Sequence, residues 1–170
     1  MFPVNVRWSF TASTDYNTLV MVVDVNRPSH TECPGLLKRT DSIVVFDHHR
    51  QSSEVISNPV LSYIEPYASS TCEMVAEVLQ YFTENIKLAP HEADCIYAGI
   101  LIDTSNFMTK TGVRTFEAAA YLKRCGAEVT RVRKMLRNDM DAYKARAEVV
   151  RHAEVYRGAF AISICPADKI

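Results

Sequence analysis

Two short runs of apolar, β-branched residues predict the first strands of the chain. Leu19–Val23 and Ile43–Phe46 are continuous hydrophobic runs, and an aspartate follows each at once, Asp24 and Asp47 respectively. Runs of this length without alternation are typical of strands covered on both faces, as in a parallel sheet. The segment between them, residues 26–41, has room for a short crossover. Because ligands bind at the carboxyl ends of strands in open α/β sheets, both carboxylates stand where a site is expected.

After Phe46 the hydrophobic period becomes that of amphipathic helices. A capping-box pattern, Ser70 with Glu73, precedes the first helix, and Pro90 begins the second. A third helix is predicted over residues 115–125, before Gly126, and two more over 128–137 and 139–152. The fold class predicted is α/β, with a parallel sheet flanked by helices.

Near the C-terminus, Phe160, Ile162 and Ile164 alternate with small or polar residues, which predicts a further strand. One interpretation is that a second domain begins here. The alternative is a hairpin-like addition to the main sheet.

Composition narrows the class of protein. The 170 residues are 48% hydrophobic, with 19 basic and 20 acidic side chains and a net charge of -1. This balance argues against a chain that holds double-stranded nucleic acid through bulk positive charge. No apolar run is long enough to cross a bilayer and no secretory signal is visible, so we expect no membrane contact from this segment. The five cysteines, without a C-x-x-C pair, are expected to be reduced, mostly buried thiols of a cytoplasmic chain.

Three acidic residues and two histidines suggest a metal site. Asp47-His48-His49 follows the second strand, and Asp103 follows the apolar run Gly99–Ile102, as Asp24 follows the first strand. Adjacent histidines can offer one imidazole to a metal and one to an anionic substrate. Carboxylates with one imidazole suit Mn²⁺ or Mg²⁺ better than structural zinc. The alternative is a polar loop with two solvated histidines.

Basic residues near these acids are candidates for anion binding. Arginine side chains suit phosphate oxygens, and Arg27 and Arg114 are the leading candidates. Ser70 stands at a helix start, where free N–H groups favour an anion. Plain helix capping explains the Ser70 hydroxyl equally well.

Four segments together resemble the DHH phosphoesterase superfamily: Asp24–Ser29, Val45–Arg50, Glu65–Thr71 and Gly99–Phe107. The following segment, Lys110–Ala119, is similar to its GdpP-type branch, the cyclic di-AMP phosphodiesterases. The resemblance implies a DHH-type domain that hydrolyses cyclic di-AMP to the linear dinucleotide pApA with two Mn²⁺ ions. It leaves a homodimer of the complete protein open.

The resemblance also implies roles for individual residues. Asp24, His48 and Asp103 would bind metal, with Asp24 bridging two ions. His49 would face the substrate phosphate, and Asp47 would not bind the metal itself but would hold the neighbouring ligands in position. Arg27, Arg114 and Ser70 are the further phosphate-binding candidates, with His49 and Arg114 taken as catalytic.

The superfamily's first metal-binding motif and its DHHA1 domain are not found in the sequence. We therefore expect the middle of a longer protein, with membrane helices upstream. The expected division is an unplaced segment over 1–17, a partial DHH domain over 18–138, a connector helix over 139–154 and the start of a DHHA1-like domain over 155–170. The alternatives are an oligoribonuclease or pAp phosphatase of the same superfamily, and a non-catalytic fragment.

Overall fold

The computed structural model describes residues 18–82 and 87–164. The unplaced segment 1–17 and Cys165 lie outside the described residues. The chain forms two compact units, Met1–Glu128 and Val129–Ile170.

The first unit contains a three-stranded parallel sheet. Its strands are β1 (Val20–Val23), β2 (Ile43–Asp47) and β3 (Leu61–Ile64), in the order β1-β2-β3. Two short 3-10 turns, Pro28–His30 and Pro34–Lys38, fill the crossover between β1 and β2. The parallel sheet is confirmed, but the prediction of only helical structure soon after Phe46 was wrong at β3. The sequence of β3, Leu-Ser-Tyr-Ile, lacks a continuous apolar run, and none of its residues is fully buried.

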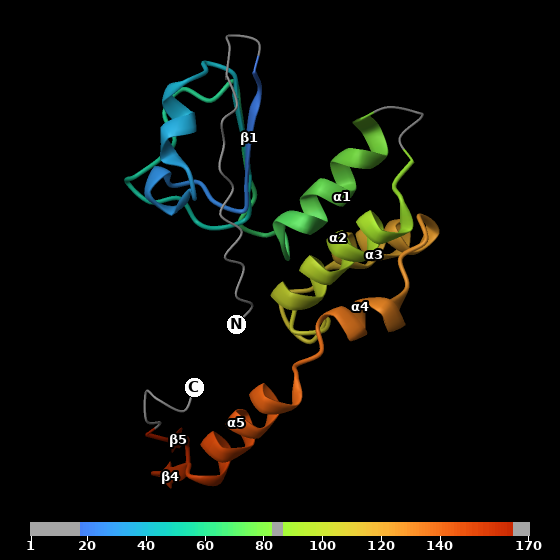
Figure 1. The fold of residues 1–170 in the computed structure, drawn as a ribbon. Coiled ribbons are helices and arrows are strands. Elements are labelled where there is room, and N and C mark those ends of the chain that lie inside the picture. The colour runs from blue at the N-terminus through green and yellow to red at the C-terminus, as the bar shows by residue number, and fades with distance from the viewer. Residues whose placement is uncertain (1–17, 83–86, 165–170) are drawn as a thin grey trace. The chain divides into compact units, whose positions relative to one another are not determined.

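Three helices pack on one another beside the sheet: α1 (Thr71–Phe82), α2 (Pro90–Asp103) and α3 (Val113–Arg124). Helix α1 also packs on β2, and Figure 1 shows the three helices running close together. Gly126 follows α3 with a φ of 100°, in the left-handed region that favours glycine. The predicted flanking helices are confirmed.

Alternation along β2 places one hydrophobic cluster on each face of the sheet. Ile43 and Val45 pack with Val22 and Ile56 on one face. On the other face, Phe46 packs with Met74 of α1. Burial of both faces explains why β2 is hydrophobic at consecutive positions.

Glycine is required where α1 and α2 approach each other. A Cβ atom at Gly99 of α2 would overlap the Sγ atom of Cys72 in α1. The absence of a side chain at this position brings the beginning of α1 close to the C-terminal half of α2.

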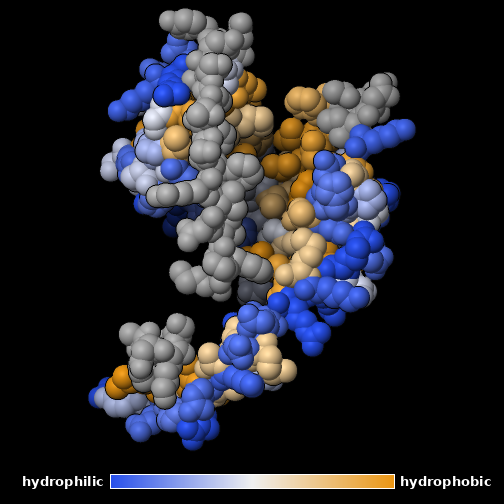
Figure 2. Space-filling view, viewed as in Figure 1, coloured by the Kyte–Doolittle hydropathy of each residue, from blue (hydrophilic) through white to orange (hydrophobic). Residues whose placement is uncertain are grey.

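The second unit contains α4 (Val129–Met135), α5 (Met140–Arg151) and an antiparallel hairpin of β4 (Glu154–Tyr156) and β5 (Phe160–Ile162). The carboxylate of Asp139 caps α5, accepting a hydrogen bond from the Ala142 N–H at 2.7 Å. No residue of α5 is buried, and the apolar side chains of the hairpin are exposed, as the orange surface in Figure 2 shows. The hairpin is a sheet of its own and pairs with no strand of the parallel sheet among the described residues.

The described cysteines are more exposed than the sequence suggested. None of the four described cysteines is fully buried: Cys33 and Cys95 are exposed, and Cys72 and Cys125 are half-buried. The expectation of mostly buried thiols was therefore wrong for the described residues, because these cysteines lie in a turn and at helix positions near the surface.

Within the part of the chain that is described, no helix is both long and apolar enough to span a membrane.

Candidate metal centre

Asp24 stands where β1 ends and the chain turns sharply. Its backbone has a φ of 68°, which is uncommon for a residue with a side chain. The turn is held by the Asp24 N–H, which donates to the carbonyl oxygen of Phe46 at 2.9 Å. The carboxylate accepts a hydrogen bond from the hydroxyl of Thr71 at 2.8 Å. Left-handed backbone at a non-glycine residue is typical of functional sites, where the surrounding structure enforces it.

His48 follows β2 directly, and its imidazole lies between two carboxylates. The Nε2 atom is 3.7 Å from Asp24 Oδ1 and 3.6 Å from Asp103 Oδ2. The Nδ1 atom is 3.3 Å from the carbonyl oxygen of Ala68. A carbonyl can only accept, so this contact favours the tautomer with the proton on Nδ1. The lone pair of Nε2 then faces the two carboxylates.

These separations fit a metal ion. Distances of 3.6 and 3.7 Å are too long for hydrogen bonds. They suit atoms that each lie about 2.0–2.6 Å from a shared cation. A neutral imidazole nitrogen facing carboxylate oxygens is also the donor chemistry that such a cation requires.

His49 lies beside His48, with their ring centroids 4.4 Å apart, and is held by Asp47. Its Nδ1 is 2.8 Å from Asp47 Oδ1, and the Asp47 carboxylate, fully buried, also accepts from Asn26 Nδ2 at 2.5 Å. The His49 side chain is 60% exposed. Ligand atoms of Asp24, His48 and His49 lie within 4.8 Å of one another. The exposed edge of His49 is therefore available to an ion or to a bound anion.

Asp103 is the last residue of α2, not the end of a strand. Burial raises the pKa of its carboxyl group; His48 opposes this shift and the charge of Asp24 adds to it. The following residue, Thr104, is buried and fixes the chain: its hydroxyl donates to the Ile100 carbonyl at 2.6 Å and accepts from the Phe107 N–H at 3.0 Å. The end of α2 thus holds Asp103 against His48.

The predicted anion-binding residues differ in their surroundings. Arg27 is half-buried and forms no ion pair with another described residue. Arg114, in the first turn of α3, donates twice to the Glu77 carboxylate at 2.7 Å, and this interaction raises the pKa of its guanidinium. Arg114 therefore already has an ion-pair partner on α1, whereas Arg27 makes no ion pair with a described residue and acts on the Glu54 carboxylate only through its charge.

Ser70 is a helix cap in this structure. Its side chain is fully buried, and its hydroxyl oxygen accepts from the Glu73 N–H at 3.0 Å. The Glu73 carboxylate bonds instead to the N–H and hydroxyl of Ser69. Of the two interpretations of Ser70, the geometry favours helix capping, because the hydroxyl is buried and engaged.

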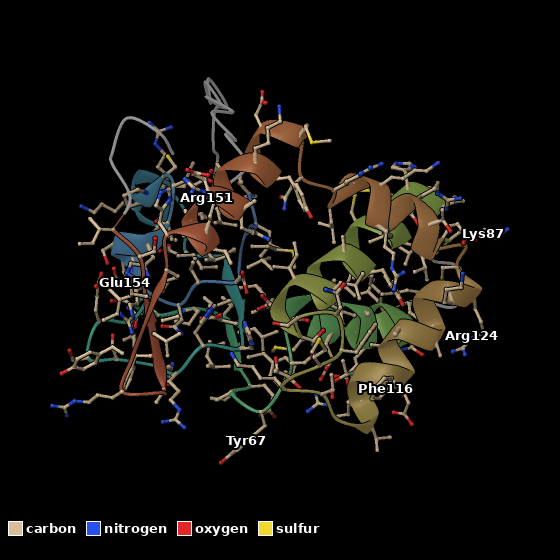
Figure 3. The ribbon with its side chains drawn as sticks, turned by 90° about the horizontal axis from the view of Figure 1, so that it is seen from below. Tyr67, Lys87, Phe116, Arg124, Arg151 and Glu154 are labelled. Atoms are coloured by element: carbon tan, nitrogen blue, oxygen red, sulfur yellow. The ribbon has the colours of Figure 1, made fainter. Side chains whose placement is uncertain are left out.

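Several residues of the centre were not singled out from the sequence. Thr71 holds Asp24 through its hydroxyl, and Asn26 holds Asp47 through its side-chain amide. The carbonyl of Ala68 holds His48. Asn26 and Thr71 lie inside segments that carry the family resemblance, which was their only signal. The loop that contains Ala68 also exposes Tyr67, which points away from the fold in Figure 3.

Comparison with known proteins decides the family. Residues 4–100 match the model of the DHH family, N-terminal domain. The chain belongs to the DHH family. The match starts at residue 4, inside the segment that sequence motifs left unplaced.

Curated relatives place this DHH chain more closely. It is 42% identical over 150 residues to the cyclic-di-AMP phosphodiesterase GdpP of Bacillus subtilis, covering 88% of this chain and 23% of that protein. The predicted resemblance to GdpP-type proteins is confirmed. The chain spans about a quarter of the length of such a relative. It is also 33% identical over 98 residues to a probable manganese-dependent inorganic pyrophosphatase of Thermotoga maritima, covering 57% of this chain and 17% of that protein.

A solved structure shows the same fold. An exopolyphosphatase-related protein from Bacteroides fragilis superposes with a TM-score of 0.72 at 17% sequence identity. The similarity covers 82% of this chain and 42% of that one. It supports the α/β fold, a parallel sheet flanked by helices.

Proposed function

We propose that this DHH chain belongs to a metal-dependent phosphodiesterase that hydrolyses cyclic di-AMP to pApA. The observation that carries the proposal is the position of His48 Nε2, 3.7 Å from Asp24 and 3.6 Å from Asp103. The substrate is proposed from the 42% identity to GdpP. The name of the Thermotoga relative supports manganese as the metal.

Asp24, His48 and Asp103 would hold the metal. When bound, a pair of Mn²⁺ ions supplies an activated hydroxide and stabilises charge on the attacked phosphate. The geometry of Asp24 suits a bridging role, since its carboxylate is more than half exposed and only one of its oxygens accepts from Thr71. The Nδ1 contact with Ala68 keeps the His48 lone pair available at Nε2.

The remaining residues would bind and orient the substrate. Asp47 holds His49 through Nδ1, so that its Nε2 is directed to a phosphate oxygen. The Asp47 carboxylate also accepts from the His49 backbone N–H at 3.1 Å, so both the ring and the backbone of His49 are held. Addition of water to phosphorus then breaks one P–O3′ bond and opens the ring, leaving a terminal phosphate and a free 3′-hydroxyl.

Arg114 contributes from α3 in this proposal, with Glu77 fixing its guanidinium. A second carboxylate, that of Glu65, lies 3.9 Å from Arg114 Nη1. Glu65 directly follows β3. Because one N–H fork is taken by Glu77, Arg114 is better suited to orienting a phosphate through its remaining donors than to binding it alone.

The proposed setting is the cytoplasm, with the longer protein anchored to the membrane elsewhere. The cyclic dinucleotide is the proposed partner, and a homodimer of the complete protein is compatible with the proposal.

The test compares substrates in the gene product at its natural length. Purified protein is incubated with Mn²⁺ and cyclic di-AMP, pAp or short RNA, and the products are separated by chromatography. We expect cyclic di-AMP to be the preferred substrate and Asp24→Asn to abolish turnover. Asp41→Asn, an exposed aspartate before the opposite end of β2, is the matched control and keeps activity. Preferred cleavage of pAp or RNA would instead identify the chain as an oligoribonuclease or pAp phosphatase.

A further inference from the structure

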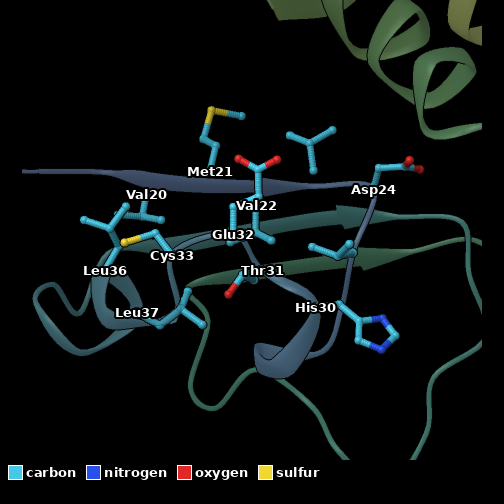
Figure 4. Close-up of a pocket in the computed structure, with 12 residues that line it drawn as sticks. Val20, Met21, Val22, Asp24, His30, Thr31, Glu32, Cys33, Leu36 and Leu37 are labelled. Carbon is cyan, nitrogen blue, oxygen red and sulfur yellow. The ribbon is translucent and has the colours of Figure 1, made fainter. Parts of the chain in front are cut away.

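A pocket of about 240 Å³ adjoins the candidate metal centre. Asp24, Asp47 and His49 line it from the centre, and Asn26, Arg27 and His30 line it from the segment that follows β1. Figure 4 draws a second pocket, along β1, which shares Asp24 and His30 with this one; it shows His30 on the turn after β1, at the same end of the sheet as Asp24. One cavity therefore joins the proposed metal ligands to two basic side chains.

Those two side chains are available to a ligand. Arg27 is half-buried and has no ion pair with a described residue, and His30 is exposed. Their immediate sequence neighbourhood, Asn26-Arg27-Pro28-Ser29-His30, contains no acidic residue. A guanidinium and an imidazole N–H are both donors to phosphate oxygens.

The turn that carries them is fixed before any ligand binds. The Glu54 carboxylate accepts from the Ser29 N–H at 2.9 Å and from the Ser29 hydroxyl at 2.8 Å. The His30 N–H donates to the Arg27 carbonyl at 3.1 Å. These bonds lower the pKa of Glu54, and the charges of His30 and Arg27 lower it further, so the carboxylate stays ionised. A fixed turn reduces the entropy that binding would otherwise cost.

The other end of the same segment is tied to the metal centre. Asn26 is buried; its side-chain amide donates to Asp47, and its backbone carbonyl accepts from the Ile56 N–H at 3.3 Å. Ile56 lies two residues after Glu54, so one short stretch of the loop between β2 and β3 holds both ends of the turn. The distance between the basic pair and the centre is thereby set by the fold.

The proposed substrate needs such a second position. A cyclic dinucleotide carries two phosphodiester groups in one ring, and only one of them can lie at the metal centre. We propose that Arg27 and His30 bind the second phosphodiester of the cyclic dinucleotide, and that Glu54 is a positioning residue that holds their turn through Ser29. This inference rests on the proposed function and assigns the substrate contacts within it.

The experiment measures selectivity between two substrates of one metal centre. Cyclic di-AMP has a second phosphodiester, whereas bis(p-nitrophenyl) phosphate has a single one. In the natural-length protein with Mn²⁺, kcat/KM is measured for both. Arg27→Ala and His30→Ala should each lower the ratio of the cyclic di-AMP value to the bis(p-nitrophenyl) phosphate value about tenfold, mainly through KM, because each removes a charge-assisted contact.

Glu54→Ala should lower the same ratio about threefold to tenfold, and Glu54→Gln, which keeps the side-chain oxygen as an acceptor for Ser29, should recover part of the loss. His91→Ala is the matched control, since His91 is an exposed histidine at the start of α2. It should leave both values unchanged.

The outcomes distinguish failure of the proposed function from failure of the second phosphate position alone. If the parent protein cleaves bis(p-nitrophenyl) phosphate but not cyclic di-AMP, the proposed function fails, and this inference fails with it. If cyclic di-AMP is cleaved and the ratio is unchanged in Arg27→Ala and His30→Ala, only the second phosphate position is wrong. An equal fall for both substrates also overturns it, because the residues then act on the metal centre or the fold.

Discussion

The hydroxyl of Thr71 donates a hydrogen bond to the carboxylate of Asp24 at 2.8 Å, across 47 residues of sequence. Asp24 ends β1, and Thr71 is the first residue of α1. The bond joins the sheet to the helices at the candidate metal centre. It also orients the Asp24 carboxylate, since the bonded oxygen, Oδ1, is the one that lies 3.7 Å from His48 Nε2.

Thr71→Val should weaken metal binding with little change in shape. The substitution keeps the branched side chain but removes the donor, so the Asp24 carboxylate loses its orientation. Loss of such a supporting bond lowers metal affinity by about 10–100-fold. Mn²⁺ affinity measured by calorimetry tests this.

Thr115→Val is the matched control for that prediction. Thr115 is also buried near a helix start, and its hydroxyl oxygen accepts from the Gly112 N–H at 3.0 Å. Its replacement should lower stability by about 1 kcal/mol and leave Mn²⁺ affinity unchanged. Equal loss of affinity in both variants would show that the effect comes from the fold.

Substitution of His48 and substitution of His49 should differ in their effect on bound metal. His48→Ala should lose bound metal and nearly all turnover, because Nε2 is the proposed ligand. His49→Ala should retain metal at the Asp24, His48 and Asp103 group and lose turnover. Metal content by atomic emission, measured alongside activity, distinguishes them. Normal metal content in an inactive His48→Ala protein would mean that the roles of the two histidines are reversed.

Gly99→Ala should destabilise the first unit by about 1–3 kcal/mol, the usual cost of overpacking, since the new Cβ overlaps Cys72 Sγ. The better helix propensity of alanine offsets only part of this. The double substitution Gly99→Ala with Cys72→Ala removes the overlapping atom and should recover most of the loss. Urea denaturation of the three proteins measures it, and no recovery in the double variant would rule out this contact as the cause.

Cys72 should resist thiol reagents in the folded protein without metal. Burial raises the pKa of its thiol to about 11, and the charges of Asp24 and Asp103 contribute to the shift. At pH 8 only about one thiol in a thousand is then ionised. Cys33 and Cys95 are exposed and should react first. Mass spectrometry after brief alkylation tests the order, and early modification of Cys72 would contradict it.

The sequence predicted β1, β2 and their terminal aspartates because buried parallel strands form continuous apolar runs. It did not predict β3, whose residues are only partly covered. Helix starts at Pro90 and after Ser70 were recognisable because capping depends on local residue types. The sequence predicted a strand at Phe160 and Ile162 but not its partner β4, since three-residue strands leave almost no periodic signal.

The candidate site shows the same limit. Asp24, His48 and Asp103 were named because each follows an apolar run or lies in a family segment. The support from Thr71 and Asn26 depends on side chains meeting across the fold, and no local pattern encodes that. Ser70 had two interpretations that the sequence could not separate, and burial of its side chain favours helix capping.

The most direct test of the metal centre is a crystal structure of the manganese-loaded protein, with anomalous scattering recorded at the manganese edge. The account predicts a peak about 2.0–2.6 Å from His48 Nε2 and from carboxylate oxygens of both Asp24 and Asp103. A manganese peak elsewhere in the protein, with His48 Nε2 unliganded, would contradict it.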